Sequence, residues 1–298
     1  MLLKNSSRTL LLMSFVSLLT VGCAEQVPDY SGRFFQGEPL SEIEVEANES
    51  WATFNSEKTR LVFGTHNESW TNHALFESVQ TASGWSSPTL LPFSGQFNDR
   101  GVRFYPALDA LLFSSDRPVV GESAPGDFNL WIAMHDGQEW MAPEALTTVN
   151  TDANDMHGSV SETGSIYFAS DREGGMGQFD LYRAKLGMDG YEVEALSGEV
   201  NSTYSESDVY VDGLERYLIF SRADDPIGMG GDDLFISFRD GDDWSTPQHL
   251  GPEVNTENLE YGAEVSRDGR LLYYTSHGAE KADILSVLIT SLQIEWPQ

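Results

Sequence analysis

Ile166-Tyr167-Phe168 is a short apolar run that ends in an aromatic residue, and the chain contains four more runs of this kind. They are Leu61-Val62-Phe63, Leu111-Leu112-Phe113, Leu218-Ile219-Phe220 and Leu272-Tyr273-Tyr274. Successive runs begin 50, 55, 52 and 54 residues apart. A recurrence of about 50 residues indicates a repeat architecture, in which each unit is one supersecondary motif.

Each repeat carries further markers of short strands. A second apolar pair follows each run, at Leu75-Phe76, Leu130-Trp131, Leu181-Tyr182, Leu234-Phe235 and Ile284-Leu285. In the first four copies an aromatic residue then follows a polar turn, at Trp85, Trp140, Tyr191 and Trp244. Turn-bounded segments rich in aromatic and branched residues predict strands. Four short strands in each unit of about 50 residues are typical of a propeller blade.

We therefore predict an all-β fold, a five-bladed β-propeller rather than a six-bladed one. The predicted blades are 49–98, 99–154, 155–205, 206–259 and 260–298. The last copy is too short for a fourth strand, whereas Ser41-Glu42-Ile43-Glu44-Val45 alternates polar and apolar residues as a half-buried strand does. We expect residues 39–47 to complete the last blade and close the ring, which removes two open sheet edges.

The N-terminus has the organisation of a targeting segment. Lys4 and Arg8 precede an uncharged stretch of 14 residues, 9–22, which is shorter than the roughly 20 residues of a membrane-spanning helix. Thr20-Val21-Gly22-Cys23 resembles a bacterial lipobox, although Thr20 stands where Leu is usual. The resemblance implies a signal peptide over 1–22, lipidation of Cys23 and, with Ala24 next, anchoring at the outer membrane in the periplasm. Residues 23–38 are polar, with Gly, Pro and Gln and no clear periodicity, which predicts a tether. The alternative is an ordinary secretory signal and a soluble periplasmic or secreted protein.

Charge excludes one class of partner. The chain has 47 acidic and 17 basic residues, a net charge of -30, and removal of residues 1–22 leaves 15 basic residues and a charge of -32. Nucleic-acid binding needs clustered Lys and Arg, so we expect no nucleic-acid partner. The single Cys excludes an intramolecular disulfide framework.

One repeat carries a more specific pattern. Val149-Asn150-Thr151 is followed by Ser170-Asp171-Arg172, a glycine-rich stretch and Asp180-Leu181-Tyr182. This resembles the repeat of the TolB-type β-propeller family, and partial matches extend the resemblance over about residues 49–290. The first copy departs most, with Glu57-Lys58 where the family has Asp-Gly. The resemblance implies a propeller and leaves its partner open.

An acidic residue precedes each apolar run by 11 or 12 positions. These residues are Glu49, Asp99, Asp155, Glu206 and Glu260. Equivalent positions of a closed propeller form a ring, which we expect near one mouth of the channel. One hypothesis is that each carboxylate accepts backbone N–H bonds and pins a loop. The other is that the ring holds a cation such as Ca²⁺ or a cationic group of a partner. No other cofactor is predicted.

Four loop residues are candidates for contact with a ligand: Asp116, Arg117, Asp171 and Arg172. The alternative for them is that each Asp caps a turn and each Arg pairs locally. The six His residues show no metal-ligand spacing, so we assign them no catalytic role.

Function is predicted from the equivalence of the acidic positions. Catalytic carboxylates need unequal surroundings so that their pKa values diverge, whereas these acids recur in every repeat. We therefore predict a binding or scaffolding propeller of the bacterial cell envelope that is not an enzyme, with envelope proteins, glycans or peptidoglycan as partners and a lipid anchor in the membrane. The alternatives are a carboxylate-dependent enzyme resembling glycoside hydrolases, and a receptor for a cation or small ligand at the channel mouth.

Overall fold

Strands account for almost all the regular structure of this protein. The computed structural model describes residues 48–105, 107–119, 126–188 and 190–297. These residues form strands β1 to β21 and one short 3₁₀ helix, η2 (Ile289–Ser291), with no α-helix among them. No helix in these ranges is long and apolar enough to cross a bilayer.

The strands follow one another in five groups, which we number as blades 1 to 5. Blade 1 contains β1 (Asn48–Phe54), β2 (Arg60–His66), β3 (Ala74–Thr81), β4 (Gly84–Trp85) and β5 (Thr89–Leu90). Blade 2 contains β6 (Asp99–Phe104), β7 (Ala110–Ser115), β8 (Asn129–Met134) and β9 (Glu144–Ala145). Blade 3 contains β10 (Asp155–Val160), β11 (Ile166–Ser170), β12 (Asp180–Gly187) and β13 (Gly190–Ala195). Blade 4 contains β14 (Ser205–Val211), β15 (Tyr217–Ala223), β16 (Asp232–Asp240), β17 (Asp243–Trp244) and β18 (Gln248–His249). Blade 5 contains β19 (Leu259–Val265), β20 (Leu271–His277) and β21 (Ala282–Leu288).

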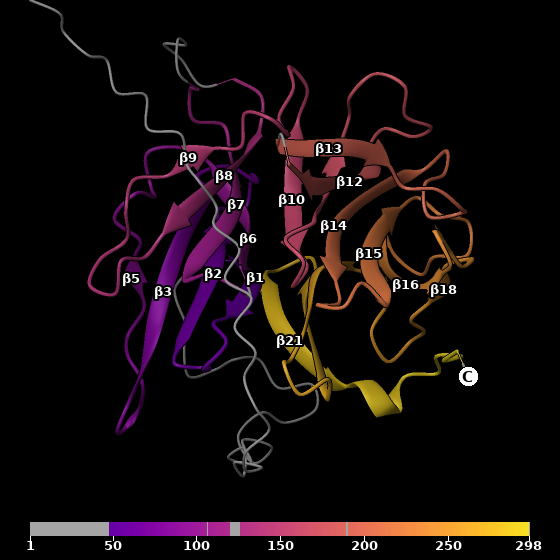
Figure 1. The fold of residues 1–298 in the computed structure, drawn as a ribbon. Helices are drawn as coiled ribbons and strands as arrows, with labels where there is room; N and C mark the ends of the chain where they lie inside the picture. The colour runs from indigo at the N-terminus through magenta and orange to yellow at the C-terminus, as the bar shows by residue number, and fades with distance from the viewer. Residues whose placement is uncertain (1–47, 106, 120–125, 189, 298) are drawn as a thin grey trace, which may run out of the picture. The chain divides into compact units, whose positions relative to one another are not determined.

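Neighbouring strands within each blade pair antiparallel, and the first strand of each blade lies innermost. These inner strands contact one another in the cyclic order β1, β6, β10, β14, β19 and back to β1. Figure 1 shows the closure, with indigo β1 beside yellow β21. The predicted all-β propeller is confirmed. The closing strand expected at 39–47, the signal peptide and the tether lie outside the described residues.

The apolar runs that revealed the repeat form the second strand of each blade. Phe113, Phe168 and Phe220, on β7, β11 and β15, are completely buried. Both faces of these strands are covered because the sheets of successive blades stack face to face, and each of the five core clusters combines side chains of at least two blades. Continuous apolar runs, rather than alternating ones, follow from that double coverage.

Each inner strand contains a β-bulge at the same place. The register shifts lie between Ser50 and Thr53 and at the corresponding points of β6, β10, β14 and β19. One residue in each bulge has a positive φ, between 50° and 66°; these are Trp51, Gly101, His157, Asp208 and Gly262. Because a bulge redirects the side chain at that position, these five positions define a register of their own.

Candidate functional site

The predicted acidic ring is part of the interior of the blades. Asp99, Asp155, Glu206 and Glu260 have no exposed surface, and Glu49 is 9% exposed. Three of these carboxylates are held by an arginine of their own blade: Arg117 to Asp99 at 2.5 Å, Arg172 to Asp155 at 2.6 Å and Arg222 to Glu206 at 2.8 Å. Glu260 accepts a bond of 2.8 Å from the Ser276 hydroxyl instead. Burial raises the pKa of Asp99 and of Glu206.

The same carboxylates fasten the loop that enters each blade. Asp155 accepts the backbone N–H of Thr151 at 2.6 Å, and Glu260 accepts that of Thr256 at 2.9 Å. The residue before each threonine clamps the previous blade, since the Asn150 amide bonds both the N–H and the C=O of Leu130. The Asn-Thr pairs of the repeat are therefore fasteners between successive blades.

This geometry supports the structural hypothesis for the acidic ring. Backbone amides, hydroxyls and guanidinium groups occupy the carboxylate oxygens, and the described residues contain no group of three or more His, Cys, Asp or Glu side chains that could hold a metal ion. The calcium site that we considered at this register therefore has no geometric support in the described part of the chain.

The four loop candidates also serve the fold. Asp116 accepts bonds from the backbone and side-chain N–H groups of Asn98, at 2.9 and 2.6 Å. Asp171 does the same for Asn154, at 2.8 Å in both bonds. Arg117 and Arg172 point back to the ring acids of their own blades. These contacts match the local pairing that we gave as the alternative.

A different set of side chains meets on the propeller axis, two residues after the ring acids. The Trp51 indole donates from Nε1 to Oδ1 of Asp208, and His157 Nδ1 lies 3.2 Å from Oδ2 of the same carboxylate. The rings of Trp51 and His157 have centroids 5.5 Å apart. Blades 1, 3 and 4 thus each contribute one side chain to this group, while blades 2 and 5 have glycine at this register.

The two glycines make room for these side chains. A Cβ at Gly101 would lie 2.7 Å from Cδ2 of His157, and a Cβ at Gly262 would lie 2.9 Å from Cδ1 of Trp51. Asp208 is fully enclosed, and its pKa is lowered by His157 and by the Trp51 bond against the opposing effect of burial. The carboxylate is therefore ionised on the axis.

Aromatic and histidine side chains surround this group at the end where the inner strands begin. Trp70 stacks on His66 at 4.5 Å, lies 4.6 Å from His277 and lies 5.8 Å from Tyr261, measured between ring centroids. His73 lies 5.9 Å from Trp51. We call the residues Trp51, His66, Trp70, His73, Arg100, His157, Asp208, Asp224, Asp232, Tyr261 and His277 the axial site. Trp70 is 38% exposed, so one aromatic surface of the site reaches solvent.

Three histidines of the axial site, His66, His73 and His277, are neutral, and the first two have unused acceptors. Burial lowers the pKa of His66 and of His277, and lowers that of His73 to about 3. His66 Nδ1 faces the Asn67 carbonyl and His73 Nε2 faces the Trp70 carbonyl, so these nitrogens carry the hydrogen. The other nitrogens, His66 Nε2 and His73 Nδ1, are buried without a hydrogen-bond partner in the described structure. A buried acceptor of this kind needs a partner, which a bound water or a ligand hydroxyl can supply.

Arg100 supplies the positive charge of the axial site. Its guanidinium lies 3.8 Å from the centroid of the Phe128 ring and donates from NH2 to Sδ of Met156 at 3.3 Å. Its Nε has no hydrogen-bond partner among the described residues. The charge of Asp208 acts on Arg100 and opposes the lowering of its pKa by burial.

Two further carboxylates lie at the edge of the axial site in blade 4. Asp232 begins β16 and forms the single parallel pair with Leu259 that joins blades 4 and 5. Burial, followed by the charges of Asp208 and Asp224, raises its pKa to about 6. Asp224 follows β15 directly across the hairpin, bonding Gly231 through its backbone, and is exposed. Blade 4 therefore holds one carboxyl group whose pKa is raised to about 6 and, in Asp208, one whose pKa is lowered.

Our sequence analysis missed the axial site. It gave the histidines no role, yet His66, His73, His157 and His277 all belong to this site. The available signal was the register two residues after the ring acids, where the repeats hold Trp, Gly, His, Asp and Gly. At that register the residue type differs from repeat to repeat, whereas the acidic ring has Asp or Glu in every repeat.

Solved structures with the same fold extend over most of the chain. A glycoside hydrolase has a TM-score of 0.56 and 10% identity, with 89% of this chain and 95% of that chain covered. The endo-arabinase from Bacteroides thetaiotaomicron VPI-5482 has a TM-score of 0.55 and 12% identity, with 86% and 97% covered. A puromycin-hydrolysing peptidase from Mycobacterium tuberculosis matches at 11% identity with a TM-score of 0.47, covering 81% of this chain, which spans 36% of that protein. No family model and no curated protein matches the sequence.

These neighbours correct our prediction of function. We expected a non-catalytic scaffold, and this was wrong: the neighbours that align along nearly their whole length are glycoside hydrolases, which favours the enzyme that we had given as the alternative. At 10 to 12% identity the likeness itself establishes the fold, so the chemistry must be argued from the axial site.

Proposed function

We propose that this protein is a carboxylate-dependent enzyme resembling glycoside hydrolases, with its reaction centre at the axial site. The observation that carries the proposal is the divergence of pKa values within blade 4, where Asp232 has a pKa of about 6 and Asp208 a lowered one. Glycoside hydrolysis uses one protonated carboxyl group and one carboxylate, and unequal environments assign the two roles.

Asp232 is the proton donor in this proposal. Its proton passes to the glycosidic oxygen as the bond between that oxygen and the anomeric carbon breaks. Asp224, which is exposed, is the carboxylate that reaches the anomeric centre, either as the nucleophile or as the base that takes a proton from water. Asp208 is a positioning residue, because it is buried and bound to Trp51 and His157, and its charge adds to burial in raising the pKa of Asp232.

The rest of the axial site fits a sugar. The exposed face of Trp70 is a surface on which a sugar ring can stack. The unused acceptors His66 Nε2 and His73 Nδ1 match hydroxyl donors, and Arg100 Nε matches a hydroxyl or ring oxygen. Neutral imidazoles suit this task because they accept hydrogen bonds from uncharged groups.

We also propose, on the sequence alone, that lipidation of Cys23 anchors the protein at the outer membrane. Cys23 lies outside the described residues. Palmitate labelling of the wild type that is lost in Cys23→Ser supports the anchor, and equal labelling of both contradicts it. The TolB-type resemblance of the repeat likewise stays a prediction.

The test of catalysis is a substrate panel of aryl pyranosides, aryl furanosides and polysaccharides, read by released phenol or reducing ends. We expect turnover by the wild type, a loss of about 100-fold or more in kcat for Asp232→Asn and for Asp224→Asn, and wild-type activity for the exposed control Asp242→Asn. Asp208→Asn should retain part of kcat but move the alkaline limb of the pH profile to lower pH, since the pKa of Asp232 falls. Turnover that survives in Asp232→Asn, or no turnover on any member of the panel, contradicts the proposal.

A further inference from the structure

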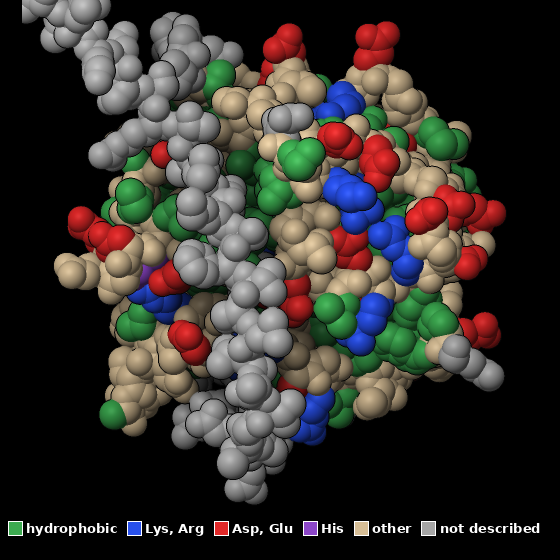
Figure 2. All heavy atoms as spheres, in the orientation of Figure 1, with side chains coloured by type: hydrophobic (Ala, Val, Ile, Leu, Met, Phe, Trp, Pro, Cys, Tyr) green, Lys and Arg blue, Asp and Glu red, His purple; other side chains and the backbone are tan. Residues whose placement is uncertain are grey.

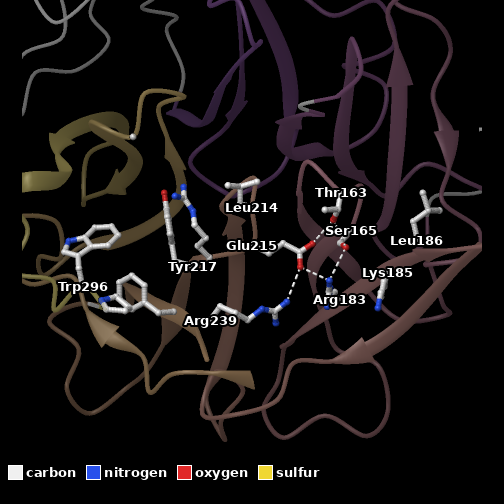
Figure 3. Close-up of a pocket in the computed structure, with 14 residues that line it drawn as sticks. Thr163, Ser165, Arg183, Lys185, Leu186, Leu214, Glu215, Tyr217, Arg239 and Trp296 are labelled. Carbon is white, nitrogen blue, oxygen red and sulfur yellow. Dashed lines mark hydrogen bonds and ion pairs between the residues drawn. The ribbon is translucent and has the colours of Figure 1, made fainter. Parts of the chain in front are cut away.

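A second site lies at the opposite end of the inner strands from the axial site. It is a pocket of about 820 Å³ between blades 3 and 4, lined by residues of the β10–β11 turn, β12, the β14–β15 turn, β16 and the tail after η2. Figure 3 shows Glu215 at its centre, with Arg183 and Lys185 on one side and Tyr217 and Trp296 on the other. All residues that line this pocket belong to the described part of the chain.

Glu215 is a structural anion that holds two guanidinium groups in place. It accepts bonds from the Tyr167 hydroxyl at 2.7 Å and from the Thr163 hydroxyl at 2.9 Å. Arg183 lies 2.6 Å and Arg239 lies 3.2 Å from its Oε2. Hydrogen bonds from Tyr167, Thr163 and Ser161 outweigh burial and lower the pKa of Glu215 to about 2. The oxygens of the Glu215 carboxylate are therefore already bonded to neighbouring side chains, and these contacts fix the orientation of Arg183 and Arg239.

The pocket is cationic although the protein is strongly acidic. Arg183, Lys185, Arg216 and Arg239 line it, against the single carboxylate of Glu215. Arg216 is already paired with Asp212, and Arg183 also lies 3.9 Å from the exposed carboxylate of Glu194. No ion pair is seen for Lys185 in the described structure, and Arg183 Nε is buried without a partner. Figure 2 shows Lys and Arg side chains gathered over β12, β14 and β15, with Asp and Glu around them. Unsatisfied cationic donors in one hollow indicate an anionic ligand.

The other end of the pocket is aromatic. Trp296 is 47% exposed and stands edge to face against Phe238 at 5.3 Å and against Tyr217 at 5.9 Å. The tail that carries it is fastened by two bonds between Gln248 and the backbone of Glu295, at 3.1 and 2.9 Å. An exposed indole held in this way offers a flat apolar surface, and the Thr163 and Ser165 hydroxyls line the pocket as well.

We propose that this pocket binds an anionic sugar residue, one that carries a carboxylate or a phosphate. The anionic group meets Lys185 and the free edges of Arg183 and Arg239, the sugar ring packs on Trp296, and the hydroxyls bond Thr163 and Ser165. This site is separate from the axial site, so it does not depend on the catalytic proposal. It gives an acidic protein one place where an acidic glycan is attracted rather than repelled.

The test is titration of the full chain with glucuronate, glucose 6-phosphate and neutral glucose, followed by calorimetry and by tryptophan fluorescence. We expect one or both anionic sugars to bind at least about tenfold more tightly than glucose, with affinity falling as salt rises. The anion that binds more tightly identifies carboxylate or phosphate as the preferred group.

Variants locate the binding. Lys185→Ala and Trp296→Ala change exposed side chains, so we expect both to fold and to weaken binding about tenfold or more. Lys281→Ala, an exposed lysine outside the pocket, is the matched control and should bind as the wild type does. Equal affinity for glucose and the anionic sugars, no binding at about 10 mM, or unchanged binding in both pocket variants would overturn the proposal.

Discussion

The indole of Trp51 donates a hydrogen bond to the carboxylate of Asp208, although 157 positions separate the two residues in the sequence. The bond joins blades 1 and 4 across the propeller axis. His157 of blade 3 approaches the second oxygen of the same carboxylate at 3.2 Å. One buried anion thus connects three blades.

Trp51→Phe tests how much the hydrogen bond to Asp208 contributes to the free energy of unfolding. The variant keeps most of the ring volume but removes the N–H, so we expect a loss of about 1.5 to 3 kcal/mol in the free energy of unfolding. Urea denaturation measures it, with Trp85→Phe, a half-buried indole elsewhere in blade 1, as the control. In the Asp208→Asn background the loss should shrink; an equal loss in both backgrounds would contradict a role through Asp208.

Asp232→Asn should change how stability depends on pH. The folded protein retains the Asp232 proton up to a pKa of about 6, whereas the unfolded chain releases it near 3.8. Between these values the folded state binds more protons, so stability falls as pH rises from about 4 to 6. The variant lacks this dependence. Its free energy of unfolding should exceed that of the wild type by up to about 3 kcal/mol at pH 7, and by little at pH 3.5. Thermal unfolding across this range decides it, and an equal gain at both pH values would refute the raised pKa.

Asp155→Ala tests the structural role of the ring acids. The carboxylate is completely buried against Arg172, Ser170 and Thr151, so its removal leaves a guanidinium without its counterion and should cost about 3 to 5 kcal/mol. Asp152→Ala, exposed in the same loop, should change stability little. Calcium added to the wild type should leave the melting temperature unchanged, and a calcium-dependent rise that disappears in Asp155→Ala would restore the cation hypothesis.

Gly262→Ala tests how tightly the axis is filled. The new methyl group would meet the Trp51 ring at 2.9 Å at a φ of +66°. Gly269→Ala places a methyl group at a φ of +70° with nothing within 4 Å, so it carries the backbone strain alone. We expect a cost of about 1 kcal/mol for Gly269→Ala and about 1 to 3 kcal/mol more for Gly262→Ala. Equal melting temperatures would mean that the axis has free space.

The propeller was predictable because the second strand packs in the same way in every repeat. Each second strand is buried on both faces, so Ile166-Tyr167-Phe168 and its four counterparts are apolar without alternation, and their spacing gives the fold directly. The acids behind them recur for the same reason, since Asp155 and its counterparts fasten equivalent loops. Equivalence between repeats is therefore evidence for architecture.

The axial site was not predictable by that logic, because its residues differ between repeats. Trp70 lies in the connection between β2 and β3, whereas Asp232 begins β16, so no repeat alignment places them together. Trp51, His157 and Asp208 do share a register, but only the bulge in each inner strand, with its positive φ, turns that register onto the axis. The distances among them depend on closure of the whole ring.

The filled bulge register also means that described side chains occupy the propeller axis. The side chains of Trp51, His157 and Asp208 contact one another on the axis. Gly101 and Gly262 lie against them and leave no room for a side chain of their own. The axial site and the pocket around Glu215 therefore lie on opposite sides of these side chains. Substitutions in one of the two sites can therefore be made without direct contact with a ligand bound at the other.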